Sequence, residues 1–250
     1  MIAKEKLVNI IEHAMIAEYR RDTEKEAMLM EALTSLDEEE IKDVAGLMLI
    51  GRNDQRCKID EDCYYDSFED YFREIREEIF HLCSGNKHEL ADYMMSKVPL
   101  VRYLEDGYKN LYSNMIDKND SSEMSLNERL ELVERTAMEC RITALKHGRF
   151  RTEPEDREEL KNLLGTMSGK DIADITWIVV RGSRSYGEPA MLFVSKEEMC
   201  SYLCDKTDDL PSYIVEGCII YNMKWPYSAD LGEEYNRYRD RLEEKMMSEG

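Results

Sequence analysis

Cysteine and histidine are the residues of this chain best suited to hold a metal ion, because zinc prefers thiolate and imidazole ligands. They form two groups along the sequence: Cys57, Cys63, His81 and Cys83, and further on Cys200, Cys204 and Cys218. Neither group has the paired C-x-x-C spacing of a zinc knuckle or ribbon, and free cysteine commonly packs as a small apolar residue. We therefore predict no metal site, no cofactor and reduced thiols.

No pattern in the sequence indicates nucleophilic or phosphate chemistry. The four histidines stand apart from one another: His13, His81, His88 and His147. The sequence contains neither a nucleophile elbow nor a glycine-rich phosphate loop. We therefore assign no catalytic residue and predict that the protein is not an enzyme. A metal-dependent hydrolase that uses Asp, Glu and His is the weakest alternative.

Two basic segments interrupt an otherwise acidic chain, at residues 146–151 and 181–187. Arginine binds carboxylates through paired hydrogen bonds and stacks on flat groups, and aromatic residues often anchor protein interfaces. We predict that these segments supply the contact residues: Arg149, Phe150, Arg151, Arg181, Arg184 and Tyr186. The alternative is that the arginines only neutralise neighbouring acidic helices.

The net charge limits the classes of partner. The 250 residues include 54 Asp and Glu against 34 Lys and Arg, which gives a formal charge of −20. Because this charge repels nucleic-acid backbones and anionic membrane surfaces, we predict proteins or cations as partners, with a protein partner favoured, no direct nucleic-acid binding and no membrane association. No apolar run approaches the ~20 residues of a membrane span, and the first residues do not resemble a signal peptide. The expected location is the cytoplasm.

The elements that carry these residues recur along the chain. Three blocks match in the same order: residues 5–15 with 128–138, 33–51 with 164–182, and 87–107 with 196–217. A missed repeat would misassign the whole fold, so this pattern takes precedence over local motifs. We predict an all-α protein of two tandem, related multi-helix units that pack about a pseudo-two-fold axis.

The first copy is predicted to span residues 1–118 and the second residues 124–250, with the polar segment 118–123 as the linker. The first copy carries residues between its second and third blocks that the second copy lacks. These residues are expected to form an extra helix at about 66–83. The second copy is expected to end in a helix at about 230–247, in which Glu and Arg alternate.

Each copy contains an apolar helix that follows a capping sequence. The helix should begin near Asp37 in the first copy and near Ser168 in the second, because these side chains can accept hydrogen bonds from first-turn amides. Gly51 and Gly182 are expected to end the two helices as left-handed caps. The β-branched run 175–180 could instead form a hairpin strand. Its partner segment in the first copy is poor in β-branched residues, so a helix is favoured.

Tyrosine and glycine recur at one spacing in both copies. Tyr103 precedes Gly107 by four residues, as Tyr213 precedes Gly217. On one face of a helix, this spacing lets a second backbone approach the glycine beside the tyrosine ring. Glycine inside a helix costs ~1 kcal/mol relative to alanine. The repetition of this glycine in both copies therefore favours a packing role over ligand binding.

Three segments of the first copy together form a recognisable combination: residues 50–54 (IGRND), 90–94 (LADYM) and 99–107 (PLVRYLEDG). They resemble an uncharacterised family of small bacterial all-helical domains. The resemblance covers residues 25–115 and, more weakly, 155–222, where a degenerate tandem duplicate would lie. It implies a helical domain without implying an activity. The second copy departs from the pattern at residues 181–184.

These features predict a non-catalytic interaction or regulatory protein. Its contact surfaces would be the diverged loop of the second copy and the acidic faces. The alternative is an acidic mimic of nucleic acid that inhibits a nucleic-acid-binding protein, as phage counter-defence inhibitors do. Acidic residues clustered along one stripe and a steep dependence of binding on salt would mark such a mimic.

Overall fold

The computed structural model describes residues 1–20, 23–52, 67–115, 124–226 and 228–249. All regular elements in these ranges are helices and none is a strand, which confirms the all-α class. The run 175–180 is helical, so the hairpin alternative is wrong. None of the described helices combines the length and the apolar character needed to cross a bilayer.

Some sequence predictions fall outside the described residues. They concern Cys57 and Cys63 of the first cysteine group, residues 53–54 of the family pattern, and the linker 118–123.

The chain divides into two compact units, one of residues 1–117 with 190–192 and one of residues 118–189 with 193–250. The described helices of the first unit are α1 (Lys4–Arg20), α2 (Thr23–Ser35), α3 (Glu38–Arg52), α4 (Phe68–Leu82), α5 (Lys87–Met95) and α6 (Leu100–Met115). Those of the second are α7 (Leu126–Lys146), η1 (Pro154–Arg157), α8 (Glu158–Thr166), α9 (Gly169–Ser183), η2 (Arg184–Tyr186), α10 (Lys196–Asp205), α11 (Leu210–Ile220) and α12 (Ala229–Glu249).

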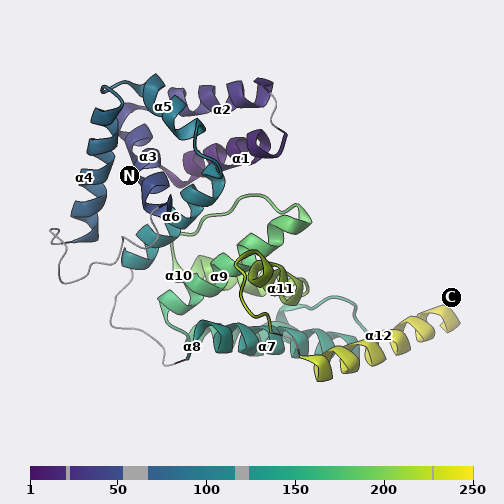
Figure 1. The fold of residues 1–250 in the computed structure, drawn as a ribbon. Coiled ribbons are helices and arrows are strands. Elements are labelled where there is room, and N and C mark those ends of the chain that lie inside the picture. Colours follow the sequence, from purple (N-terminus) through teal and green to yellow (C-terminus); the bar gives the residue numbers. More distant parts are fainter. Residues whose placement is uncertain (21–22, 53–66, 116–123, 227, 250) are drawn as a thin grey trace. The chain divides into compact units, whose positions relative to one another are not determined.

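Helix α3 forms the centre of the first unit, where it packs against α6, α4 and α5 (Figure 1). It is buried on nearly all sides because apolar residues and glycine occupy every position from Val44 to Gly51. Large, fully buried side chains of this unit include three from α3 and one each from α2, α5 and α6: Ile41, Leu47, Met48, Leu33, Leu90 and Leu104. The removal of this apolar surface from water drives the unit to fold.

The predicted helix starts are confirmed. The amide of Glu40 donates to Asp37 Oδ1 at 2.8 Å, and the amide of Asp37 donates back to Glu40 Oε2 at 3.1 Å. In the second unit, the amide of Asp171 donates to Ser168 Oγ at 3.0 Å. Each contact occupies an amide that has no partner within its own helix.

The prediction that Gly51 and Gly182 cap their helices is wrong. Helix α3 continues to Arg52 and α9 to Ser183, and neither glycine has a positive φ. A Cβ on Gly51 would overlap the carbonyl oxygen of Tyr103 in α6, and one on Gly182 would overlap that of Tyr213 in α11. The glycines are therefore needed for close contact between two backbones and not for a left-handed turn.

The Tyr–Gly spacing has the predicted packing role. A Cβ on Gly107 would overlap the carbonyl oxygen of Leu47, and one on Gly217 would overlap that of Ile178. In each pair of helices, α3 with α6 and α9 with α11, both helices thus contribute one glycine to the contact. This reciprocal contact brings the two helix backbones unusually close.

In the second unit, α9 packs against α11, α10 and α7, while α12 lies along α7. Leu231 of α12 joins an apolar cluster with Met138 and Ile142 of α7. The guanidinium of Arg141 lies 4.3 Å from the centre of the Tyr235 ring, which adds a cation–π contact. Figure 1 shows α12, in yellow, running on past the end of α7.

Candidate functional site

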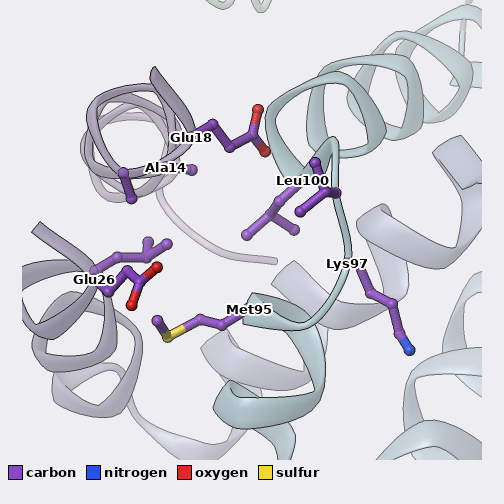
Figure 2. A pocket seen from close by; sticks show the side chains of 9 residues that line it. Ala14, Glu18, Glu26, Met95, Lys97 and Leu100 are labelled. Carbon is purple, nitrogen blue, oxygen red and sulfur yellow. The ribbon is translucent and has the colours of Figure 1, made fainter. Parts of the chain in front are cut away.

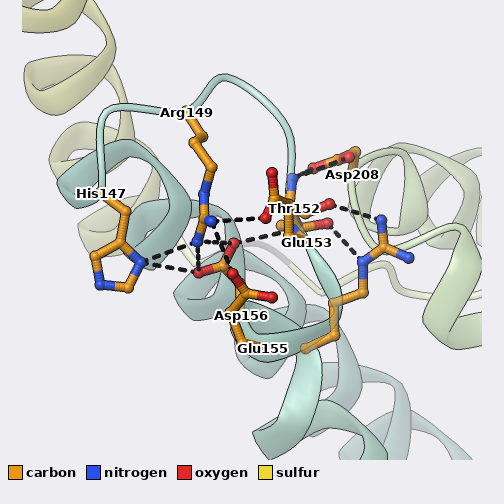
Figure 3. Close-up of polar contacts among 8 residues, drawn as sticks. His147, Arg149, Thr152, Glu153, Glu155, Asp156 and Asp208 are labelled. Carbon is orange, nitrogen blue, oxygen red and sulfur yellow. Dashed lines mark hydrogen bonds and ion pairs between the residues drawn. The ribbon is translucent and has the colours of Figure 1, made fainter.

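The first basic segment follows the end of α7 and is held by an internal polar network (Figure 3). Arg149 Nη2 donates to both carboxylate oxygens of Asp156, at 2.8 and 2.9 Å. Its Nη1 donates at 2.8 Å to Glu153 and to Glu155. Because three carboxylates already surround this guanidinium, the geometry gives Arg149 a structural role. Its neighbours Phe150 and Arg151 remain exposed.

Asp156 is the centre of this network, and its side chain has no exposed area. Burial would raise the pKa of its carboxyl, but hydrogen bonds from the Glu153 amide and from His147, together with the Arg149 charge, outweigh burial and hold the pKa below its usual value. The donor distances are 2.9 Å from the Glu153 amide and 3.0 Å from His147 Nδ1. The ionised carboxylate therefore fixes the turn between α7 and η1.

A second set of contacts joins this turn to the connection between α10 and α11. The amide of Thr152 donates to Asp208 Oδ1 at 3.1 Å. Arg157 donates from Nε to Thr152 Oγ1 at 2.9 Å and from Nη2 to the Thr152 carbonyl at 2.7 Å. The segment from residue 147 to 157 is thus a rigid part of the second unit.

The lowered pKa of Asp156 predicts how stability depends on pH. A carboxyl with a lowered pKa in the folded state contributes stability above its unfolded pKa of about 3.9, and this contribution is lost as pH falls through the folded value. We expect Asp156→Asn to destabilise the protein at pH 7 and to differ less from wild type as pH approaches 2. Urea unfolding at several pH values measures both effects. A constant difference between the proteins at all pH values would contradict the prediction.

The second basic segment contains η2 and ends at Gly187, whose φ of 83° gives the left-handed conformation that favours glycine. The predicted contact residues in this segment differ in exposure. Burial lowers the pKa of Arg184 to about 10, so this guanidinium stays charged at neutral pH but sits largely within the unit. Arg181 is half-buried, whereas Tyr186 is 56% exposed. Tyr186 is therefore the predicted residue best placed to touch a partner.

Tyr186 rests on a supporting layer of aromatic and charged side chains. Its ring centre lies 5.3 Å from that of Tyr213. The Tyr213 hydroxyl donates to Glu188 Oε1 at 3.3 Å, and Lys206 Nζ donates to the same oxygen at 2.7 Å. Burial, with the nearby carboxylates Asp209 and Glu188, raises the pKa of Tyr213, which keeps its hydroxyl protonated. The loop thus holds Tyr186 in a fixed place.

The end of α11 adds exposed apolar residues that the sequence analysis did not single out. Ile219, Ile220 and Trp225 are 49%, 47% and 50% exposed. A turn with Asn222 at a φ of 53° ends the helix, and Met223 N donates to the carbonyl of Cys218 at 2.8 Å. This closing bond is typical of a Schellman motif and sets the direction of the chain toward Trp225. The sequence feature that could have indicated these exposed residues is an apolar helix followed closely by a tryptophan.

The cysteines resemble packing residues more than ligands. Burial raises the pKa of the Cys200 and Cys218 thiols, and it raises that of Cys204 to about 11. Protonated thiols are poor nucleophiles and poor metal ligands. Within the described ranges, no three His, Cys, Asp or Glu residues are grouped so that they could hold a metal ion.

Comparison of this chain with models of protein families, with curated proteins and with solved structures finds no match.

Proposed function

We propose that the chain is a non-catalytic protein-interaction module that binds its partner through one surface of the second unit. This α11 surface consists of Tyr186, Ile219, Ile220 and Trp225. One observation carries the proposal. These four large apolar side chains all lie between residues 186 and 225, and each is about half exposed. Single exposed apolar residues are ordinary, but several together mark interaction sites.

Helix geometry supports a common surface. Tyr186 packs on Tyr213, and Ile220 follows Tyr213 by seven residues in α11. Residues seven apart lie on the same side of a helix, ~10 Å along its axis. Ile219 is adjacent, and Trp225 follows directly after the closing turn. Tyrosine and tryptophan are the residues that most often dominate binding energy at interfaces.

Affinity capture tests the α11 surface. The full chain, with an affinity tag, is incubated in a native lysate of source cells, and the partner is quantified against the bait. We expect a stoichiometric protein partner whose recovery falls at least about tenfold with the double variant Trp225→Ala and Ile220→Ser, because such anchors contribute ≥ 2 kcal/mol each. Leu82→Ser, which removes an exposed apolar side chain from α4, is the matched control and should keep the partner.

Circular dichroism of both variants checks that the fold is retained. The proposal fails if no stoichiometric partner is recovered, or if the control loses the partner as completely as the double variant does.

The nucleic-acid-mimic alternative has less support. A mimic needs rows of carboxylates without counter-charges, whereas several acidic side chains of the first unit surround a cation. Lys42 Nζ lies 2.9 Å from Glu38, 3.2 Å from Glu39 and 3.1 Å from Glu77. Repeating the capture at high salt separates the two functions. A mimic loses its partner steeply with salt, and an apolar surface retains it.

The proposal includes a duplicated origin for the two units. The matched pairs of helices, α3 with α6 and α9 with α11, meet through glycines at corresponding positions of the repeat blocks. Two further contacts correspond. Lys87 Nζ donates to the carbonyl of Leu36, and Lys196 Nζ donates to that of Met167 at 2.5 Å. The ion pair of Lys6 with Glu40 corresponds to that of Arg129 with Asp171. Matching contacts at matching sequence positions support a common ancestor.

One substitution accounts for a difference between the units. A Cβ on Gly46 would lie 2.9 Å from a ring carbon of Phe72 and 3.1 Å from the Cβ of Arg76, so a larger residue would force α4 to shift on α3. The repeat pairs Gly46 with Trp177, which is buried and meets the ring of Phe193 edge-on at 6.5 Å. A tryptophan at this position leaves no room for a helix like α4.

A further inference from the structure

A cavity of about 450 Å³ lies in the first unit, between α1, α2 and the connection from α5 to α6 (Figure 2). This volume is within the range of ~300–1,000 Å³ that is usual for small-molecule sites. Four buried apolar side chains form part of its lining: Ala14, Ala17, Leu29 and Leu100. Figure 2 shows Met95 and Leu100 directed into the space between the helices. The cavity can therefore accept an aliphatic group.

Among the described residues of the lining, the charged ones are Glu18, Glu26 and Lys97. Glu18 Oε1 accepts a hydrogen bond from the Val101 amide at 3.1 Å, which fixes this carboxylate at the first turn of α6. The Lys97 ammonium lies 4.1 Å from the centre of the Tyr93 ring, and Figure 2 shows it directed away from the cavity. The side chains that bring charge to the cavity wall are thus carboxylates.

Glu26 is the carboxylate best placed to bind a ligand. It is exposed, and no hydrogen bond or ion pair joins its side chain to another residue of the described ranges. Figure 2 shows its carboxylate beside the open space, near Met95. A cation there would meet a carboxylate whose oxygens accept no hydrogen bond from the side chains that the structure describes.

We propose that this cavity binds an organic cation, namely an alkylammonium group on a short aliphatic body. The apolar lining would take the aliphatic body, and Glu26, with Glu18 nearby, would take the ammonium, because a cation leaving water needs a charged and hydrogen-bonded partner. The net charge of −20 also raises the local concentration of cations. Free diamines and the lysine side chain of a peptide share this chemistry. The site is separate from the α11 surface and goes beyond the function proposed for it.

Isothermal titration calorimetry of the full chain at physiological salt tests the site. The probes are 1,5-diaminopentane, Nα-acetyl-lysine methylamide and, as the uncharged control, 1-pentanol. We expect saturable one-to-one binding of an amine probe and none of pentanol. Tighter binding of the diamine would identify a free amine as the ligand, and tighter binding of the lysine derivative would identify a peptide side chain.

Three variants connect the binding to this cavity. Glu26→Gln is expected to weaken binding by about tenfold through loss of a charge-assisted contact. Glu31→Gln makes the same change of charge at an exposed position of α2 outside the lining, and it should bind like wild type. Ala17→Leu places a larger side chain in the cavity and should abolish saturable binding. Circular dichroism confirms that each variant is folded.

The proposal is overturned if neither amine gives saturable binding. It is also overturned if the Glu26→Gln and Glu31→Gln proteins bind equally well, because the amines would then only associate diffusely with an acidic protein. Neither result affects the α11 surface, whose test uses a different ligand and different variants.

Discussion

Replacement of Gly107 by alanine is expected to lower the free energy of unfolding of the first unit by about 3 kcal/mol or more. The added Cβ would overlap the carbonyl oxygen and carbonyl carbon of Leu47, which are backbone atoms of α3. A flexible side chain could rotate away from such a contact, but a helix backbone cannot. Helices α3 and α6 must therefore separate, which would loosen the core around Met48 and Leu104. Urea unfolding followed by circular dichroism measures the loss.

Two other glycines serve as controls for this experiment. Gly165 lies in α8 with no atom within 4 Å of an added Cβ, so Gly165→Ala should stabilise its unit by roughly 0.5–1 kcal/mol through helix propensity. Gly217→Ala should destabilise the second unit about as much as Gly107→Ala does the first, because its Cβ would overlap the carbonyl oxygen of Ile178. Wild-type stability of Gly107→Ala would show that α3 and α6 do not approach so closely.

These glycines also show how far the sequence determines the fold. The four-residue spacing of Tyr103 and Gly107, which Tyr213 and Gly217 share, was enough to predict a close backbone approach. The same reasoning failed for Gly51, since a glycine after an apolar stripe suits both a left-handed cap and a helix contact. Only the partner helix distinguishes them, and its Tyr103 lies 52 positions further along the chain.

The contact residues were predictable by type but not by exposure. Arg149 and Arg184 both lie in basic segments, yet one is surrounded by carboxylates and the other is largely buried. Their environments depend on Asp156 and on Tyr202 and Tyr221, which a local charge pattern does not reveal. The exposure of Ile219 and Ile220 was equally hidden, because α11 is apolar around most of its circumference and the sequence does not say which face is left uncovered.

Arg129 leads to the second large expected effect. Its guanidinium pairs with Asp171 and donates to the carbonyl of Met124 at 2.9 Å, and the two side chains of the ion pair are only 9% and 3% exposed. Arg129→Met removes the cation but keeps much of the side-chain volume. Asp171 is then left buried without its counter-charge. The removal of one partner of a buried ion pair lowers the free energy of unfolding by about 3–5 kcal/mol. Urea unfolding of the second unit measures this loss.

The corresponding pair in the first unit is the matched control, because the repeat aligns Lys6 with Arg129 and Glu40 with Asp171. The Glu40 side chain is 17% exposed, against 3% for Asp171, and Lys6 is 52% exposed, so Glu40 can regain water when the cation is removed. Lys6→Met should therefore change stability far less than Arg129→Met, since exposed ion pairs contribute little. Equal losses from the two substitutions would mean that burial does not distinguish the pairs. A larger loss at Arg129 would show that the second unit depends on a buried ion pair, whereas the first unit tolerates solvent at the matching positions.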